Sequence, residues 1–194
     1  MLNLGTAIGS AVWRLRSTFR RCFPLRWRRV GDHQSIAMIM LRRTPHPFSE
    51  QEIRLAAERA WGVAFAIGEG SRRSVFQSEK FVVLRAGPHV LSFYDSDKPF
   101  VDNPKRDIAW LANVSQQHAW IEHKAFTAVQ YANSATDVEL AHCVVAKVVV
   151  QLLDENCTGI YVPSESSLIP ADDSLSESLN QMASFRDLGV AANS

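Results

Sequence analysis

Five side chains of kinds that often act in enzyme pockets fall between residues 89 and 123 of this 194-residue chain: His89, Tyr94, Asp95, Trp120 and His123. Imidazole and carboxylate groups can exchange protons near neutral pH. Tyrosine and tryptophan supply apolar walls with one polar atom each. If the fold brought all five to one concave surface, they would suit an enzyme of unrecognised class, which we keep as the alternative function.

The local catalytic and ligand-binding patterns in the sequence are incomplete. Residues 68–73 (GEGSRR) hold a G-x-G pair and two arginines, but they lack the third glycine and the lysine that phosphate-binding loops use. His118 and His123 would point to opposite faces of a strand, so they do not predict a zinc site. No serine lies in a G-x-S-x-G elbow. We therefore expect no catalytic residue of a known class, no cofactor and no metal.

The charge of the chain is divided between its two parts, although the net charge is only +1. Residues 1–30, called the basic arm below, contain seven arginines and no acidic residue. The rest of the chain has 14 basic and 20 acidic residues, which give a net charge of −6. Such asymmetry indicates an anionic partner for the arm. The arginines expected to contact that partner are Arg14, Arg16, Arg20, Arg21, Arg26, Arg28 and Arg29.

The basic arm predicts an amphipathic helix that ends at Pro24. Its apolar residues gather within one sector of a helical wheel: Leu4, Ile8, Ala11, Val12, Leu15, Phe19, Cys22 and Phe23. A helix of this kind can lie on an anionic membrane surface, and an arginine-rich segment without acids is also typical of organellar transit peptides. The same segment could instead pack against the body of its own chain or form a tail without fixed structure.

Residues 31–194 are expected to form a single α+β domain. The composition is that of an ordinary globular protein, with 46% hydrophobic and 21% charged residues. Three cysteines without disulfide or metal-ligand spacing favour a reducing compartment. The sequence has no run of 18 apolar residues that would predict a membrane span. We expect a cytoplasmic protein that is peripheral to the membrane if the arm binds lipid.

Hydrophobic periodicity and capping signals predict the elements of this domain. Strands are expected at residues 35–41, 63–67, 81–84, 90–94, 120–126 and 158–162. Helices are expected at residues 50–61, 107–113, 136–154 and 174–183. Capping boxes begin the two main helices, from Ser49 with Glu52 and from Thr136 with Glu139. Because this order leaves little room for repeated βαβ crossovers, we predict a mostly antiparallel mixed sheet of five or six strands with those two helices on one face.

Residues 118–170 carry a resemblance to a known family. The segments HAWIEH, AHCVVAKVVVQLLDENC and TGIYVPSESSLIP are similar to those of a bacterial family described only as a domain of unknown function. The opening from residue 35 to residue 61 is similar too, and the resemblance implies a small α+β domain with a helix entering the strand at Gly159-Ile160-Tyr161. It implies no activity or catalytic residue, and it does not include the basic arm.

The divided charge and the incomplete catalytic patterns favour a non-enzymatic interaction or adaptor domain. Its partner would be another protein or an anionic membrane surface, reached through the basic arm. Specific nucleic-acid binding is not expected, because the net charge of −6 on residues 31–194 would repel phosphate groups.

Overall fold

The structure is a computed structural model that describes residues 36–78, 81–106, 108–133 and 137–184. The basic arm and its predicted amphipathic helix lie outside these ranges. The described residues form an α+β fold, as predicted, with a mixed eight-stranded sheet and four α-helices. The sequence prediction of five or six strands was too low.

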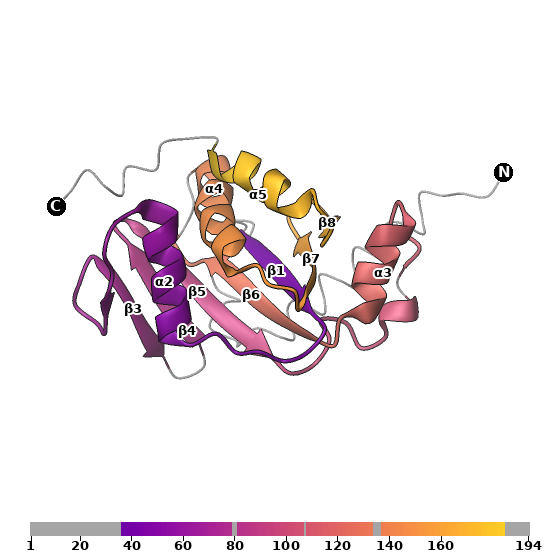
Figure 1. The fold of residues 1–194 in the computed structure, drawn as a ribbon, viewed down its shortest axis with the longest axis horizontal. Coiled ribbons are helices and arrows are strands. Elements are labelled where there is room, and N and C mark those ends of the chain that lie inside the picture. Colours follow the sequence, from indigo (N-terminus) through magenta and orange to yellow (C-terminus); the bar gives the residue numbers. More distant parts are fainter. Residues whose placement is uncertain (1–35, 79–80, 107, 134–136, 185–194) are drawn as a thin grey trace.

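The sheet has the strand order β2-β3-β4-β5-β6-β1-β7-β8 (Figure 1). Its strands are β1 (Ala37–Arg42), β2 (Ala66–Ile67), β3 (Arg73–Ser78), β4 (Phe81–Ala86), β5 (His89–Ser96), β6 (Ala125–Tyr131), β7 (Cys157–Val162) and β8 (Ser167–Pro170). All neighbouring strands are antiparallel except β2 and β3, which pair in parallel. Strand β1, the first in the described residues, therefore lies inside the sheet, between β6 and β7.

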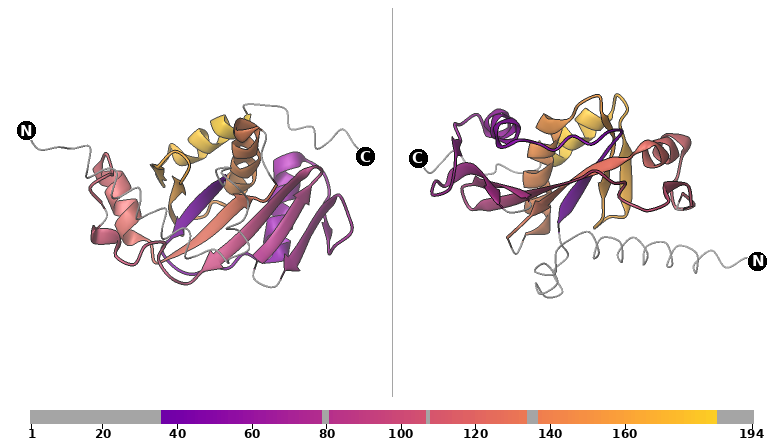
Figure 2. Two further views of the ribbon diagram at one scale, coloured as in Figure 1. Left: turned by 180° about the vertical axis from the view of Figure 1, so that it is seen from behind. Right: turned by 90° about the horizontal axis from the view of Figure 1, so that it is seen from below.

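The helices are α2 (Glu50–Trp61), α3 (Val114–Glu122), α4 (Val138–Val149) and α5 (Leu175–Ser184). Short 3₁₀ turns lie at Pro104–Arg106 and Val150–Leu152. Figure 1 shows α2, α4 and α5 over one face of the sheet, and from behind, in Figure 2, β3 to β5 lie in front of α2. The sequence predicted two main helices on one face of the sheet, and the structure adds α5 to that face.

Strand β1 is buried on both of its faces. Met38 and Met40 join a core under α2, α4 and α5, whereas Ile39 and Leu41 join a second core on the opposite face. Successive side chains of a strand point to opposite faces, so a strand covered on both sides needs an uninterrupted apolar run. This requirement explains the sequence AMIML at residues 37–41.

The second core is built around aromatic side chains from α3 and the loop before it. The ring of Trp120 makes edge contacts with those of Trp110, Phe100 and Tyr161, at centroid distances of 5.2, 6.2 and 5.5 Å. Edge-to-face aromatic pairs add stability beyond the burial of their area. In Figure 1 α3 lies at the end of the molecule farthest from β3, so this core covers only one end of the sheet.

The capping box at residue 49 is confirmed. The Ser49 hydroxyl accepts from the Glu52 backbone N–H at 3.2 Å, and the Glu52 carboxylate accepts from the Ser49 N–H at 2.8 Å. Gly62 then ends α2 with a φ of 67°, in the left-handed region that favours glycine. Strong local signals at both ends explain why the bounds of this helix were predictable.

The segment between residues 107 and 126 was predicted wrongly. No helix spans 108–113 in the described chain, and α3 begins later because Asn113 is its N-cap and accepts from the Gln116 N–H at 2.9 Å. Residues 120–126 were expected to form one strand, but α3 continues to Glu122 and β6 starts only at Ala125. The overlooked signal was Asn113 as an N-cap residue. It places the start of α3, and therefore also the start of β6, later in the sequence than predicted.

Three further differences concern β3, β8 and the start of α4. Strands β3 and β8 were not predicted from the sequence, and they acquire their strand form by pairing with β4 and β7. The predicted capping residue Thr136 lies outside the described residues. In the structure Asp137 is the N-cap of α4, and its carboxylate accepts from the Leu140 N–H at 3.0 Å.

Replacement of Gly159 is expected to destabilise the fold. A Cβ atom at this position would lie 2.8 Å from the backbone oxygen of Ile169 and 3.4 Å from the Cβ of Ala119. Gly159→Ala should lower the free energy of unfolding by about 1–3 kcal/mol, the usual cost of overpacking a filled site. Urea denaturation would measure the loss. Gly159→Ser should cost at least as much, and an unchanged midpoint for both variants would contradict this packing.

Candidate functional site

The most deeply buried charge in the described chain is that of Arg42, at the end of β1. Its side chain is 1% exposed, and its Nη2 donates to the Asp154 Oδ2 at 2.5 Å. The guanidinium also lies over the Phe48 ring, 4.6 Å from its centroid. Within the described residues, its Nε and Nη1 atoms are buried without a hydrogen-bond partner. A buried arginine held in this way requires its partners in order to remain inside the protein.

Asp95, on β5, lies close to this arginine on the same face of the sheet. Its two carboxylate oxygens accept from the Thr127 hydroxyl at 2.5 Å and from the Phe48 N–H at 3.2 Å. Burial raises the pKa of Asp95, while these two bonds and the charges of Arg42 and His46 act in the opposite direction. Because both oxygens already accept bonds within the protein, the carboxylate serves to anchor the backbone at Phe48.

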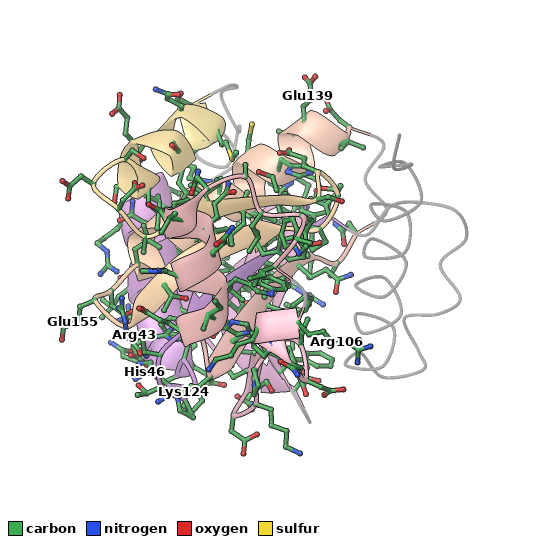
Figure 3. The ribbon with its side chains drawn as sticks, turned by 90° about the vertical axis from the view of Figure 1, so that its right-hand side faces the viewer. Arg43, His46, Arg106, Lys124, Glu139 and Glu155 are labelled. Carbon is green, nitrogen blue, oxygen red and sulfur yellow. The ribbon has the colours of Figure 1, made fainter. Side chains whose placement is uncertain are left out.

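The loop after β1 is fastened to the loop before β7. Asn156 accepts from the backbone N–H and hydroxyl of Thr44 and donates to its carbonyl oxygen, at 2.9, 3.0 and 3.0 Å. Arg43 donates to the Glu155 carbonyl oxygen at 2.7 Å. Figure 3 shows Arg43, His46, Lys124 and Glu155 gathered at one corner of the molecule. This corner carries charges of both signs, and its hydrogen bonds join the loop after β1 to the loop before β7.

His123 is buried at the end of α3 and has partners for both ring nitrogens. Its Nε2 accepts from the Phe100 N–H at 3.0 Å, and its Nδ1 lies 2.5 Å from the Trp120 carbonyl oxygen. These partners assign the proton of the neutral ring to Nδ1. Burial lowers the pKa of His123 to about 4, against the weaker effect of the bond to Trp120. At neutral pH His123 is therefore a neutral link between α3 and the Phe100 loop.

The five residues considered for a pocket do not meet in one place. His89 and Asp95 lie on the α2 face of β5 and are six residues apart, a distance of about 20 Å along a strand. His89 contacts the Tyr131 hydroxyl at 2.8 Å. The other three, Tyr94, Trp120 and His123, lie on or beside the aromatic core of the opposite face. The structure thus forms no single pocket from all five.

The remaining candidates are distributed as follows. Residues 68–73 lead into β3 instead of a helix, so the loop lacks the helix N-terminus that phosphate binding requires. His118 belongs to α3 and not to a strand. Among the described residues no group of three or more histidine, cysteine or acidic side chains could hold a metal ion. The seven arginines of the basic arm lie outside the described residues.

One contact between side chains was missed by the sequence analysis. His142, on α4, lies 3.2 Å from the Ser164 hydroxyl through its Nε2 and 3.9 Å from the Glu165 Oε1 through its Nδ1. Ser164 and Glu165 belong to the turn between β7 and β8. His142 and Ser164 are 22 positions apart in the sequence, and no local pattern connects them.

Comparison of the chain with protein-family models, with curated proteins and with solved structures found no match. The resemblance of residues 118–170 to a bacterial family therefore stays a prediction.

The pairing of Arg42 with Asp154 can be tested by a double-mutant cycle. Asp154→Asn leaves an uncompensated buried charge and keeps the oxygen that accepts from the Asn156 N–H. Because Asp154 is 37% exposed, we expect a loss of about 2 kcal/mol, less than for a fully buried pair. Arg42→Met combined with Asp154→Asn should lose less than the sum of the single losses, by about 1 kcal/mol or more.

Denaturant unfolding of the four proteins in that cycle would give the coupling energy. The exposed pair of Arg43 and Glu122, at 3.4 Å, provides a matched control. The corresponding cycle with Arg43→Met and Glu122→Gln should show a coupling of no more than about 0.5 kcal/mol. Equal coupling energies in the two cycles would refute the importance of the buried pair.

His123 should make the protein less stable in mild acid. Below pH 6.5 the unfolded chain gains a proton at this histidine, whereas the folded chain does so only near pH 4. Stability therefore falls as the pH decreases through this window, and His123 should account for about 2 kcal/mol between pH 7.5 and pH 5. Urea unfolding at both pH values would show a smaller loss for His123→Gln. An equal loss in both proteins would contradict the assignment.

Proposed function

We propose that the chain is an interaction domain held at an anionic membrane surface by its basic arm. The observation that carries the proposal is the division of charge, with +7 on residues 1–30 and −6 on the remainder. A segment with seven arginines and no acid attracts anionic lipid, and each arginine near such a surface contributes about 1 kcal/mol. The apolar sector of the same segment would add burial at the headgroup boundary.

The hydrogen bonds of acidic side chains in the folded part support the assignment of partner binding to the basic arm. Several of them accept hydrogen bonds from the backbone of their own chain and so complete helix ends and loops. These are Glu50, Glu52, Glu58, Asp95, Asp137, Asp154 and Asp172. Carboxylates committed to internal bonds are poor candidates for recruiting a partner, which favours the arm as the region that binds outside the molecule.

The helices of the described ranges do not include a candidate membrane span. No helix there is long and apolar enough to cross a bilayer. The large exposed apolar side chains of these ranges lie singly on α2, β2, α3 and α4. They are Leu55, Ile67, Val114 and Val138. Single exposed apolar residues are normal on protein surfaces. Surface attachment through the arm is the form of membrane association that the proposal requires.

Vesicle cosedimentation of the full-length chain would test the proposal. Replacement of the seven arginines of the arm by glutamine should abolish binding to vesicles that contain phosphatidylserine, because it removes the attraction between arm and lipid. Replacement of the same seven by lysine keeps the charge and serves as the matched control, which should still bind. Binding of the unchanged chain should also weaken as salt is raised from about 0.05 to about 0.5 M.

Two results would oppose the proposal. Equal sedimentation of the glutamine and unchanged chains would remove the arm from membrane binding. Equal sedimentation with vesicles of pure phosphatidylcholine would show that lipid charge has no role. Failure to bind either kind of vesicle would leave a protein as the partner of the arm, which was the other expectation from the sequence.

A further inference from the structure

His142 joins α4 to the turn between β7 and β8 through two different contacts. Its Nε2 lies 3.2 Å from the Ser164 hydroxyl, and its Nδ1 lies 3.9 Å from the Glu165 carboxylate. The imidazole is mostly enclosed, with 13% of its side chain exposed, whereas half of the Glu165 side chain is exposed. A hydroxyl, an imidazole and a carboxylate thus follow one another in the order used for nucleophilic catalysis by serine, with the imidazole and the carboxylate 3.9 Å apart, beyond hydrogen-bond distance.

The two ring nitrogens face the groups that suit them. The nearby carboxylate favours the proton on Nδ1, which leaves the lone pair of Nε2 available to the hydroxyl of Ser164. Burial lowers the pKa of His142 below its usual value of 6.5, and the charge of Glu165 offsets part of that change. The ring is therefore neutral at pH 7, which is the state in which it can accept a proton.

The backbone N–H groups of the turn differ in their hydrogen bonding. In the turn, the Glu165 N–H donates to the Val162 oxygen at 3.2 Å and the Ser166 N–H donates to the Pro163 oxygen at 3.3 Å. The Ser164 N–H has no acceptor in the described part of the chain. The backbone N–H of a nucleophilic serine is one of the donors that stabilise the oxyanion in acyl transfer.

We propose that Ser164 is a catalytic nucleophile toward carboxylic esters, with His142 as its general base and Glu165 as a positioning residue. The inference goes beyond the interaction role proposed above and does not depend on the basic arm. The turn is partly exposed, with Ser164 half-buried and Glu165 and Ser166 exposed, and this exposed side is where the proposed ester would approach.

In the first step the Ser164 Oγ bonds to the carbonyl carbon of the ester while its proton passes to the His142 Nε2. The bond from that carbon to the alcohol oxygen then breaks, and His142 returns the proton to the leaving alkoxide. Water next attacks the acyl-serine with His142 again as base, which releases the carboxylic acid and restores the hydroxyl.

A fluorophosphonate reagent would test the nucleophile in the full-length chain. The Ser164 Oγ would form a bond to phosphorus, the phosphorus–fluorine bond would break, and fluoride would leave while His142 takes the proton. Peptide mass spectrometry should find the label on Ser164, and Ser164→Ala should lose it. Ser167→Ala, at the start of β8, is the matched control and should be labelled at Ser164 at the original rate. His142→Gln should slow labelling about 100-fold.

The positioning role of Glu165 has its own measurement. Glu165→Gln should lower the maximal rate of inactivation severalfold and leave the reagent concentration for half-maximal rate unchanged, because the carboxylate acts through the imidazole. Thermal unfolding would establish that each variant is folded. The proposal is overturned if the unchanged chain takes up no label at Ser164, a result that needs no variant. Labelling of folded His142→Gln at the original rate would overturn it as well.

Discussion

Coverage of β1 on both faces is the constraint on which the rest of this structure depends. Met38 and Met40 need the layer of α2, α4 and α5, and Ile39 and Leu41 need the aromatic core under α3. Both the helical layer and the aromatic core must therefore be in place before β1 is shielded from water. Arg42 extends the same strand, and its burial ties the end of β1 to Asp154 and to the Phe48 loop.

The elements that were predictable have strong signals close together in the chain. The α2 helix has a capping box at Ser49 and a glycine at its end, and its bounds followed from them. By contrast, β3 has few apolar residues and becomes a strand because all six of its residues pair with β4. The order of the strands, with β1 between β6 and β7, depends on contacts that no local pattern encodes.

The candidate sites show that contacts between side chains far apart in the sequence are likewise not encoded by a local pattern. Asp95 and Thr127 meet because β5 and β6 are in register, and His142 meets Ser164 because a helix crosses a hairpin turn. Residue type identified His123 as a titratable group of interest, but burial beside Trp120 and Phe100 decides that it stays neutral. Chemistry that joins residues about 20 or more positions apart requires the topology first.

The two edges of the sheet affect how readily the protein aggregates at high concentration. Its edge strands are short, with two residues in β2 and four in β8, and the latter ends at a proline. In addition, the Leu168 carbonyl of β8 accepts from the Gln116 side chain at 2.7 Å. Long unpaired edges recruit strands from other molecules and begin aggregation, and short or occupied edges resist this. The long apolar strands are thus kept to the interior of the sheet, where they are less available for strand exchange between copies of the protein.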